Sequence, residues 1–434
     1  MKANMLPRIL ILIFSLSVSC LAHAGVDIQH WTAPSGARVY FVESHSLPIL
    51  DLEVAFAAGS AYDPPGKSGL ANLTQGLIDS GAGTLDEEQI AGKWVDLGAR
   101  VSGGTDSDRA TIGLRTLSSP TERNGSIALL HTLLTAPTYP ADVLARERGR
   151  AIAALKEADT RPDAIAGKRF IQAVYPDHPY GVISTEASLQ AIVRDDLVEF
   201  HRTYYTARNA VITIVGDVSR NEAEAIANDL TTGLPAGEAA KPLPPINLPK
   251  RETIRVAHPA SQSHINIGTP GYARGDPDAF ALLVGNYVLG GGGFVSRLMQ
   301  DVREKRGLAY DVHSFFAPRK LAGPFEIGLQ TKRQQGGEAL GVTEAVLNSF
   351  LKTGPSASEL KAAKQNLADG FSLRLDSNAK LLANVSVVSF FGLPLTWIDD
   401  YPGKVAAVTA EQVRAAFARH LDPQHIITVI VAGD

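Results

Sequence analysis

The sequence predicts an α+β protein made of two homologous domains, each a mainly antiparallel sheet covered by helices. Three observations lead to this fold class. The chain of 434 residues is long enough for two or three domains, a pattern of strands and helices recurs at a constant offset, and a proline-rich segment divides the chain near its middle. Hydrophobic residues make up 45% and charged residues 20%, which is typical of a globular protein with a large core.

Two copies of one structural unit are visible in the sequence. Residues 197–218 and 413–434 each contain an amphipathic helical stretch, a short polar turn and an apolar β-branched run that ends in Gly-Asp. Phe200 aligns with Phe417, and the same offset of 217 residues aligns both segments without a gap. Each half also begins with a strand followed by a helical segment. A repeat present in only two copies predicts a pair of similar domains.

The boundary between the two units lies in the segment 234–250, which contains five prolines. Proline favours an extended, semi-rigid connector over a helix. We therefore expect an N-terminal domain over 25–233, a linker over 234–250 and a C-terminal domain over 251–434. Within each half, strands such as 38–42 alternate with long helices such as 142–158, which suits a sheet covered by helices on one face.

The first 24 residues are expected to be a signal peptide and not a part of the fold. Basic residues precede an apolar run over 9–18 that is too short to span a bilayer comfortably. Small residues stand at the two positions that a signal peptidase reads, so cleavage is expected after Ala24. The mature protein is then periplasmic or secreted. An uncleaved membrane anchor and lipidation at Cys20 are the alternatives.

Composition limits the chemistry available to the mature chain. Cys20 is the only cysteine, so cleavage after Ala24 leaves no disulfide, no thiolate nucleophile and no thiolate metal ligand. No apolar run near 18 residues follows the signal, so no membrane association is expected after cleavage. The net charge of −4 offers no broad basic surface, and nucleic acid is not expected as a partner.

The segment 59–77, GSAYDPPGKSGLANLTQGL, resembles the opening of the insulinase/pitrilysin family of zinc peptidases. In that family a similar stretch leads into His-x-x-Glu-His, in which the His residues bind zinc and the Glu activates the zinc-bound water. The residues at those positions are Asn72, Gln75 and Gly76, whose spacing keeps them on one face of a helix. Asn is a poor zinc ligand, Gln cannot act as a base and Gly has no side chain. The sequence therefore predicts a degenerate metal motif and no metal in this chain.

Other metal ligands are not evident from the spacing of residues. The third zinc ligand of the family is a Glu on a later helix, for which Glu157 is a candidate, but without the two His it is expected to be a solvated helix residue. Ten histidines follow residue 24, and no two are four residues apart. His258 and His264 could share a strand face, and His178 could stabilise a turn; a structural role is favoured for all three.

The segment 290–310, GGGGFVSRLMQDVREKRGLAY, resembles the second half of the same family. There an Arg and a Tyr seven residues apart face the zinc across a central chamber, hold the substrate carbonyl and help to stabilise the oxyanion. The matching residues, assigned as catalytic, are Arg303 and Tyr310. The alternative is a surface Arg beside a core Tyr. The four glycines before them are expected to let the backbone pass close to a bound peptide; they are Gly290, Gly291, Gly292 and Gly293.

The resemblance extends from about residue 31 to the end of the chain and implies a specific role. It implies a clamshell-shaped subunit that pairs with a homologous zinc-bearing peptidase and acts on peptides. Zinc and the catalytic Glu are expected in the partner subunit, while Arg303 and Tyr310 hold the carbonyl. The alternative is a non-catalytic peptide-binding or scaffolding protein with a peptidase-like fold. A hydrolase with another nucleophile is disfavoured, because no Gly-x-Ser-x-Gly motif stands out.

Overall fold

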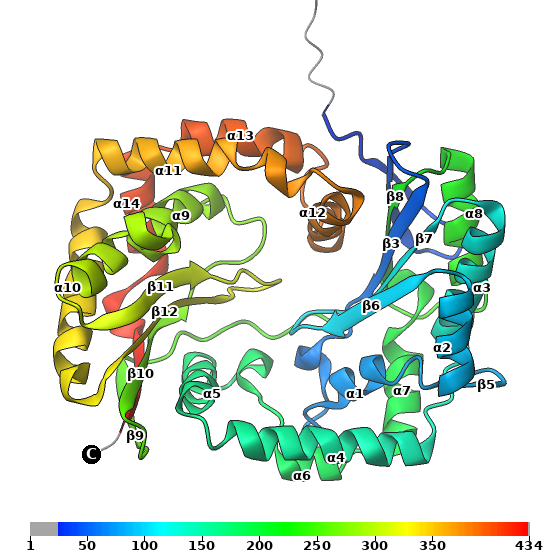
Figure 1. The fold of residues 1–434 in the computed structure, drawn as a ribbon, viewed down its shortest axis with the longest axis horizontal. Coiled ribbons are helices and arrows are strands. Elements are labelled where there is room, and N and C mark those ends of the chain that lie inside the picture. The colour runs from blue at the N-terminus through cyan, green and yellow to red at the C-terminus, as the bar shows by residue number, and fades with distance from the viewer. Residues whose placement is uncertain (1–24, 433–434) are drawn as a thin grey trace, which may run out of the picture.

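The computed structural model describes residues 25–432, which form two halves arranged as a clamshell (Figure 1). The predicted signal peptide, Cys20 and the terminal pair 433–434 lie outside the described residues. Each half is built on one twisted sheet with helices, so the α+β fold class expected from the sequence is confirmed. None of the helices in residues 25–432 combines the length and the apolar composition that crossing a bilayer requires.

The N-terminal half contains a six-stranded sheet in the order β1-β2-β8-β3-β7-β6. Neighbouring strands are antiparallel except for the parallel pair of β2 and β8. The side chains of β8 are all buried, as expected of a strand in the middle of a sheet. The strands are β1 (Gln29–Thr32), β2 (Arg38–Glu43), β3 (Ile49–Phe56), β6 (Arg100–Thr105), β7 (Ala110–Leu117) and β8 (Ala210–Gly216), with a separate small hairpin of β4 (Gly81–Ala82) and β5 (Leu85–Asp86).

Helices of the N-terminal half begin at residues that favour helix starts. Asp86 and Ser219 each form a capping box with the residue three positions later, which satisfies backbone N–H groups at the first turns of α2 and α8. The helices are α1 (Leu70–Gly76), α2 (Glu87–Asp96), α3 (Pro120–Thr135), α4 (Ala141–Ala158), α5 (Pro162–Val174), α6 (Glu186–Gln190), α7 (Arg194–Tyr204) and α8 (Arg220–Thr231).

The C-terminal half contains a five-stranded sheet in the order β11-β12-β10-β13-β9, again with one parallel pair, β13 and β9. Its strands are β9 (Glu252–Ala257), β10 (Gln262–Pro270), β11 (Ala309–Phe316), β12 (Pro324–Lys332) and β13 (Ile427–Ala432). Its helices are α9 (Ala279–Asn286), α10 (Gly336–Thr353), α11 (Ala357–Asp369), α12 (Asn378–Phe391), α13 (Trp397–Ala407) and α14 (Ala410–His420).

The internal repeat is visible in the structure. β8 and β13 begin at residues separated by the predicted offset, and they occupy equivalent places in the two sheets. Phe200 on α7 and Phe417 on α14 are both buried, so the aligned phenylalanines serve the same packing role. α11 ends at Asp369, where Gly370 occupies the C-cap.

The two halves exchange one helix each, which the sequence did not reveal. α5 of the N-terminal half packs on β10 and β13 of the other sheet, and α12 of the C-terminal half packs on β3 and β8 (Figure 1). Phe170 of α5 is fully buried in one cluster with Val429 and Val431. Helices of the same half cover one face of each sheet, as expected, and the exchanged helix covers the other face. The exchanged helix buries the face that would otherwise expose apolar side chains to water.

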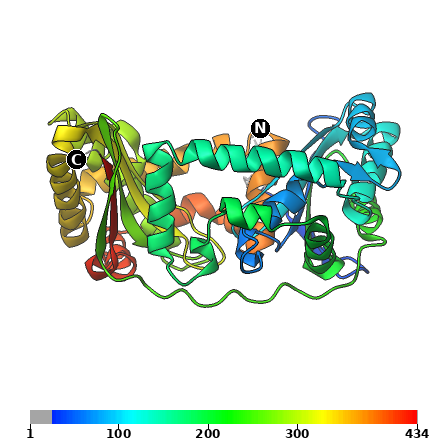
Figure 2. The same ribbon diagram turned by 90° about the horizontal axis from the view of Figure 1, so that it is seen from below.

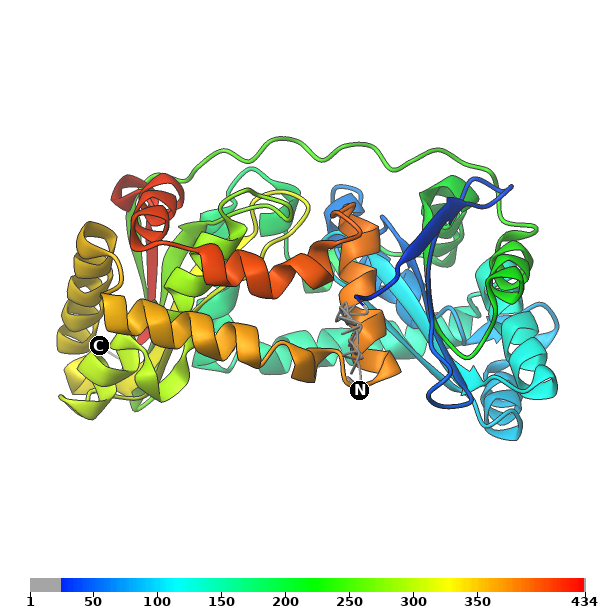
Figure 3. The same cartoon turned by 90° about the horizontal axis from the view of Figure 1, so that it is seen from above.

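The segment between α8 and β9 contains no helix or strand and runs along the molecule from one half to the other (Figures 2 and 3). Hydrogen bonds tie it down at several points, two of which involve histidines. A ring nitrogen of His178 lies 3.0 Å from the carbonyl oxygen of Pro244, and a ring nitrogen of His425 lies 2.6 Å from that of Pro249. The prolines keep the segment extended, and these contacts hold it against both halves.

Candidate functional site

The helix that resembles the zinc motif is α1, and its start is well defined. Gly69 adopts a φ of +105°, which an L side chain rarely tolerates, and so turns the chain into the helix. The carboxylate of Asp63 accepts hydrogen bonds of 2.7 Å from the backbone N–H groups of Gly69 and Ala71. Burial raises the pKa of Asp63 to about 6, although these two hydrogen bonds favour its ionised form. The scaffold of the motif is therefore intact.

The outer face of α1 carries the three residues that replace the zinc motif. Asn72 and Gly76 are exposed and Gln75 is half-buried, while the leucines of the helix face the core. The side-chain amide of Gln75 donates a hydrogen bond of 3.1 Å to the carbonyl oxygen of Thr111 on β7. The structure thus places the three residues on one face, as the spacing indicated, and gives the Gln75 amide a structural partner.

These residues do not fit a zinc ion. The face of α1 offers no imidazole and no carboxylate, and the Gln75 amide is already engaged with the backbone of β7. Glu157 lies on an exposed part of α4, and its carboxylate forms no ion pair with any residue in 25–432. No hydrolytic step can be derived from a metal at this helix.

Two of the three histidines singled out in the sequence have structural contacts. His178 is 4% exposed; its Nδ1 accepts the backbone N–H of Tyr180, and its Nε2 faces the carbonyl of Pro244. His258 contacts the backbone of Ala260 and of Thr160 in the same way. Burial lowers the pKa of His178, which favours the neutral ring that these contacts require.

One group of potential metal ligands escaped the sequence analysis because its members are distant in the chain. Asp276, Asp278 and His420 place ligand atoms within 4.8 Å of one another. Arg419, however, donates to both carboxylate oxygens of Asp278 at 2.8 and 2.6 Å and holds the pKa of that carboxyl below its usual value. A guanidinium in this position already neutralises the group, so it forms an ion-pair network between α14 and the start of α9.

Arg303 and Tyr310 are brought together at the edge of the C-terminal sheet. The guanidinium carbon of Arg303 lies 5.1 Å from the ring centre of Tyr310 and 4.8 Å from that of Phe294. Tyr310, at the start of β11, is 82% exposed, and Phe294 is 61% exposed. The alternative of a core Tyr is therefore wrong. Phe294 was not predicted; a large aromatic residue directly after four glycines was the available signal.

A π-helical turn over Met299–Glu304 presents Arg303. The turn is closed by Lys305 N–H, which donates to the carbonyl of Gln300, and by Gly307 N–H, which donates to the carbonyl of Arg303 at 2.7 Å. The side-chain amide of Gln300 also donates to the carbonyl of Phe294 at 2.7 Å and so fixes the preceding loop to the turn. Isolated π-helical turns are rare and occur frequently at functional sites.

The Arg303 guanidinium is free to bind an oxygen acceptor. Within residues 25–432 its ionic neighbour is Glu304 at 3.6 Å, and its side chain is 28% exposed. Apart from this contact, the Arg303 side chain makes no hydrogen bond or ion pair within the described residues, so its N–H groups are available. The arrangement can therefore hold a carbonyl or carboxylate next to the hydroxyl of Tyr310.

Packing within the chain and backbone conformation explain why the run Gly290–Gly293 lacks side chains. A Cβ on the first three glycines would meet atoms of Ser314, Asn286 and Tyr287 at 2.4, 2.6 and 2.6 Å. The last glycine faces open space but adopts a φ of +60°. Close packing against β11 and the preceding turn accounts for three of the four, and contact between this run and a peptide stays a prediction.

Comparison with known proteins identifies the family. The sequence profile described as "Peptidase M16 inactive domain" matches residues 191–367, which span the linker and parts of both halves. A crystal structure from Pseudomonas fluorescens, also described as a peptidase M16 inactive domain, superimposes with a TM-score of 0.91 and 36% identity over 94% of this chain and 98% of that one. The chain belongs to the M16 peptidase family. This confirms the resemblance to the insulinase/pitrilysin peptidases.

More distant relatives of this M16 protein include one named as a zinc protease and one named as a non-peptidase homolog. A Bacillus subtilis protein named "Uncharacterized zinc protease YmxG" is 25% identical over 91% of this chain and 95% of its own length. A Helicobacter pylori protein named "Non-peptidase homolog YmxG" is 23% identical over 100% of this chain and 99% of its own. With the substituted face of α1, these findings make the chain an M16 peptidase-like protein of the inactive type.

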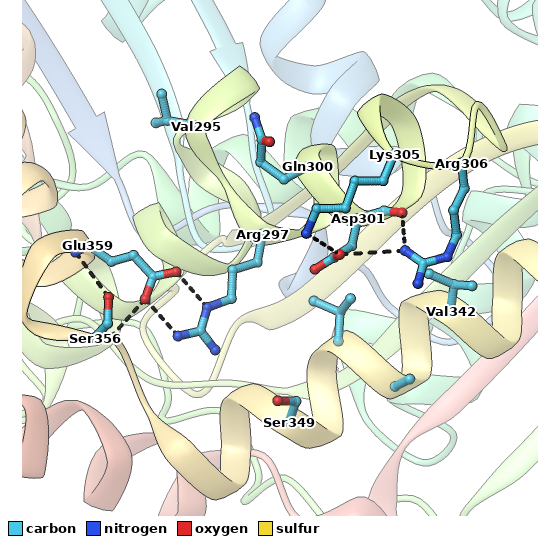
Figure 4. Close-up of a pocket in the computed structure, with 12 residues that line it drawn as sticks. Val295, Arg297, Gln300, Asp301, Lys305, Arg306, Val342, Ser349, Ser356 and Glu359 are labelled. Atoms are coloured by element: carbon cyan, nitrogen blue, oxygen red, sulfur yellow. Dashed lines mark hydrogen bonds and ion pairs between the residues drawn. The ribbon is translucent and has the colours of Figure 1, made fainter.

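The M16 chain also has a pocket of about 680 Å³ behind the π-helical turn, between the turn and α10 (Figure 4). Its charges are paired within the wall. Arg297 donates two hydrogen bonds of 2.7 Å to the carboxylate of Glu359, and Lys305 pairs with Asp301 at 2.9 Å. The guanidinium of Arg297 lowers the pKa of Glu359 to about 2. Arg303 does not line this pocket, so its paired charges fix the turn in place and do not extend the site.

Proposed function

We propose that this chain is the subunit of an exported two-chain M16 peptidase that lacks its own zinc site and supplies Arg303 and Tyr310 to a homologous zinc-bearing partner. One observation carries the proposal: the chain holds an Arg303 guanidinium beside an exposed Tyr310, while the face of α1 that would bind zinc carries no ligand. The pair is ready to bind a peptide carbonyl but has no group in this chain that activates water. A partner with the metal centre completes the reaction.

The chemistry assigned to this chain is electrostatic. As water attacks a peptide carbonyl, negative charge develops on the carbonyl oxygen. Arg303 and the Tyr310 hydroxyl donate hydrogen bonds to that oxygen, and the π-helical turn and the Phe294 ring hold the guanidinium in position beforehand. A donor fixed in advance stabilises the transition state more than a mobile one, because no reorganisation is needed during the reaction.

The test is reconstitution from purified subunits. The mature chain and a zinc-bearing M16 homologue from the same source are assayed for peptide hydrolysis alone and mixed, with Arg303→Ala in parallel. We expect no hydrolysis by this chain alone, hydrolysis by the mixture, and a loss of about 10²–10³-fold in kcat with Arg303→Ala, the range for removal of one oxyanion donor. Arg333→Ala, which removes an exposed arginine near β12, is the matched control and should leave the rate unchanged. Hydrolysis and stoichiometric zinc in the lone chain would contradict the proposal.

A second function, peptide binding without catalysis, is supported by the exposed rings of Phe294 and Tyr310. Two aromatic rings beside a guanidinium offer both apolar contact and hydrogen-bond donors to a peptide. In that case Arg303→Ala weakens peptide binding to the lone chain, and adding the zinc-bearing homologue produces no hydrolysis. The same reconstitution therefore separates the two functions.

A further inference from the structure

A second, smaller pocket lies in the C-terminal half, where α9 and α13 pack together (Figure 1). Its volume is about 150 Å³. Three aromatic rings form its wall: the ring centres of Phe280 and Trp397 lie 5.6 and 5.7 Å from that of Tyr401. A cavity of this size can accept a benzene-sized apolar group. Arg303 and Tyr310 do not line this pocket, so it is separate from the site described above.

One residue that lines this pocket carries a buried hydroxyl group without a partner. Tyr401 is 2% exposed, and within residues 25–432 its hydroxyl has no hydrogen-bond partner. Buried hydroxyl groups are normally satisfied, since leaving one unpaired costs the full desolvation of the group. Within residues 25–432 the Tyr401 hydroxyl is therefore a polar group next to this pocket that can still donate a hydrogen bond.

Two arginines line the same pocket, and their guanidinium groups have free donors. Arg274 uses its Nε to donate to the carbonyl of Pro318 at 3.1 Å, and its two terminal nitrogens have no hydrogen-bond partner within residues 25–432. The Arg374 side chain has none in the same part of the chain. Burial lowers the pKa of Arg274, and the nearby carboxylates of Asp106 and Asp108 oppose this shift only in part. An anion in the pocket would offset that cost.

The Arg274 side chain is fixed in place. Its backbone N–H donates to the carbonyl of Arg319 at 2.7 Å, and its guanidinium carbon lies 5.4 Å from the ring centre of Phe391. The following Gly275, with a φ of +84°, turns the loop toward α9. The nearby carboxylate of Asp276 lies 3.7 Å from a ring nitrogen of His420, within the ion-pair network described above. The guanidinium is thus a positioned donor at the edge of an aromatic cavity.

We propose that this pocket binds a carboxylate attached to a small apolar group, with the apolar group among the rings of Phe280, Trp397 and Tyr401 and the carboxylate on Arg274. Arginine binds carboxylates with two parallel hydrogen bonds, and Arg374 and the Tyr401 hydroxyl supply further donors. Two sources present this chemistry: a free small carboxylic acid, and the C-terminal residue of a peptide with an apolar side chain. The proposal does not depend on a zinc-bearing partner.

The experiment is isothermal titration calorimetry on the lone mature chain. The probes are N-acetyl-L-phenylalanine and its carboxamide, followed by a short peptide ending in Phe with a free or an amidated C-terminus. We expect the acid to bind at least about tenfold more tightly than the carboxamide, the difference expected for a charge-assisted hydrogen bond. If N-acetyl-L-phenylalanine binds and the peptide with a free C-terminus does not, the ligand is a free small acid. If the peptide with a free C-terminus is preferred over its amide as strongly as the acid is preferred over its carboxamide, the ligand is the C-terminal residue of a peptide.

Variants separate the pocket from general charge effects. Arg274→Gln should weaken binding of the acid by about tenfold or more, whereas Arg333→Gln, which removes an exposed arginine elsewhere, should not change it. Tyr401→Phe removes only the hydroxyl and should weaken binding by about threefold while keeping the ring. Equal affinities for acid and carboxamide, no binding of either, or full binding by both pocket variants would overturn the proposal. None of these results depends on hydrolysis, so failure here is distinct from failure of the reconstitution.

Discussion

The two halves share one architecture but have kept different parts of it. In the N-terminal half, α1 retains its buried leucines and its Asp63 cap, while its outer face carries Asn72, Gln75 and Gly76. In the C-terminal half, the π-helical turn presents a half-buried Arg303 next to two exposed rings. One half has kept the scaffold without the chemistry of a metal site, and the other has kept both scaffold and exposed polar groups.

This difference shows that the residues of α1 that pack in the core and the residues that would carry out chemistry can change independently. The buried side of α1 belongs to the core of the N-terminal half, so losing it would destabilise the fold. Its outer face contributes little to stability, so its residues can change once hydrolysis is not required of this half. The exposed Tyr310 also contributes little to stability. Its place beside Arg303 at a π-helical turn is therefore the feature that points to function.

The largest expected effect is on the free energy of unfolding, and it concerns the packing of the exchanged helix α5 on the sheet of the other half. Phe170 of α5 is fully buried against the sheet of the other half, so Phe170→Ala should destabilise the protein by about 3–5 kcal/mol, the usual cost of removing a buried phenylalanine. Urea unfolding measures the free energy. Arg169→Ala, at an exposed position on the same helix, should stay within about 0.5 kcal/mol. A small effect of Phe170→Ala would mean that the exchanged helix does not hold the halves together.

The next effect tests the chemistry of the C-terminal half. Tyr310→Phe removes one hydroxyl from an exposed ring and should leave the fold unchanged. In the reconstituted enzyme it should lower kcat by about 10²-fold, because a donor to the developing oxyanion is lost. KM should change little, since the ring and Arg303 still contact the peptide. A loss confined to KM would instead assign Tyr310 to ground-state binding.

Much of this comparison could be read from the sequence because it rests on local patterns. The repeat, the helix over 142–158 and the one-sided spacing of Asn72, Gln75 and Gly76 all follow from residues close together in the chain. The exchange of α5 and α12 could not be read, because an amphipathic helix does not specify which of two similar sheets it covers. The aromatic cavity at Tyr401 and the ion-pair network at Asp278 are built from distant segments, and only the tertiary fold brings them together.

A smaller effect concerns the ion pair that anchors the π-helical turn of the C-terminal half. Arg297 lowers the pKa of Glu359 from 4.5 to about 2, so Glu359 binds fewer protons in the folded state than in the unfolded state at intermediate pH. The ion pair therefore contributes stability that is fully present above about pH 4.5 and is lost as the pH falls toward 2. We expect it to contribute about 2 kcal/mol at neutral pH, typical of hydrogen bonds between charged groups.

Unfolding in urea between pH 2 and 7, compared for the natural chain and Glu359→Gln, measures this contribution. The variant should be less stable at neutral pH, and the difference between the two chains should shrink as the pH falls from 4.5 toward 2. NMR titration of the Glu359 carboxyl gives the pKa directly. A Glu359 pKa near its usual value of 4.5 would mean that the Arg297 pair does not hold the π-helical turn.

The smallest expected effect is on the outer face of α1, and it tests the comparison most directly. If the N-terminal half has lost its chemistry, the double variant Asn72→Ala, Gln75→Ala should change kcat/KM of the reconstituted enzyme by less than about twofold, which corresponds to under about 0.5 kcal/mol. The variant should lose at most about 1 kcal/mol of stability, because Gln75 gives up its hydrogen bond to the Thr111 carbonyl. Steady-state kinetics and urea unfolding on the same preparation separate these two quantities. A loss of activity comparable to that of Tyr310→Phe, in a variant that folds normally, would show that this face still contacts the substrate, and the division of roles between the two halves would then be wrong.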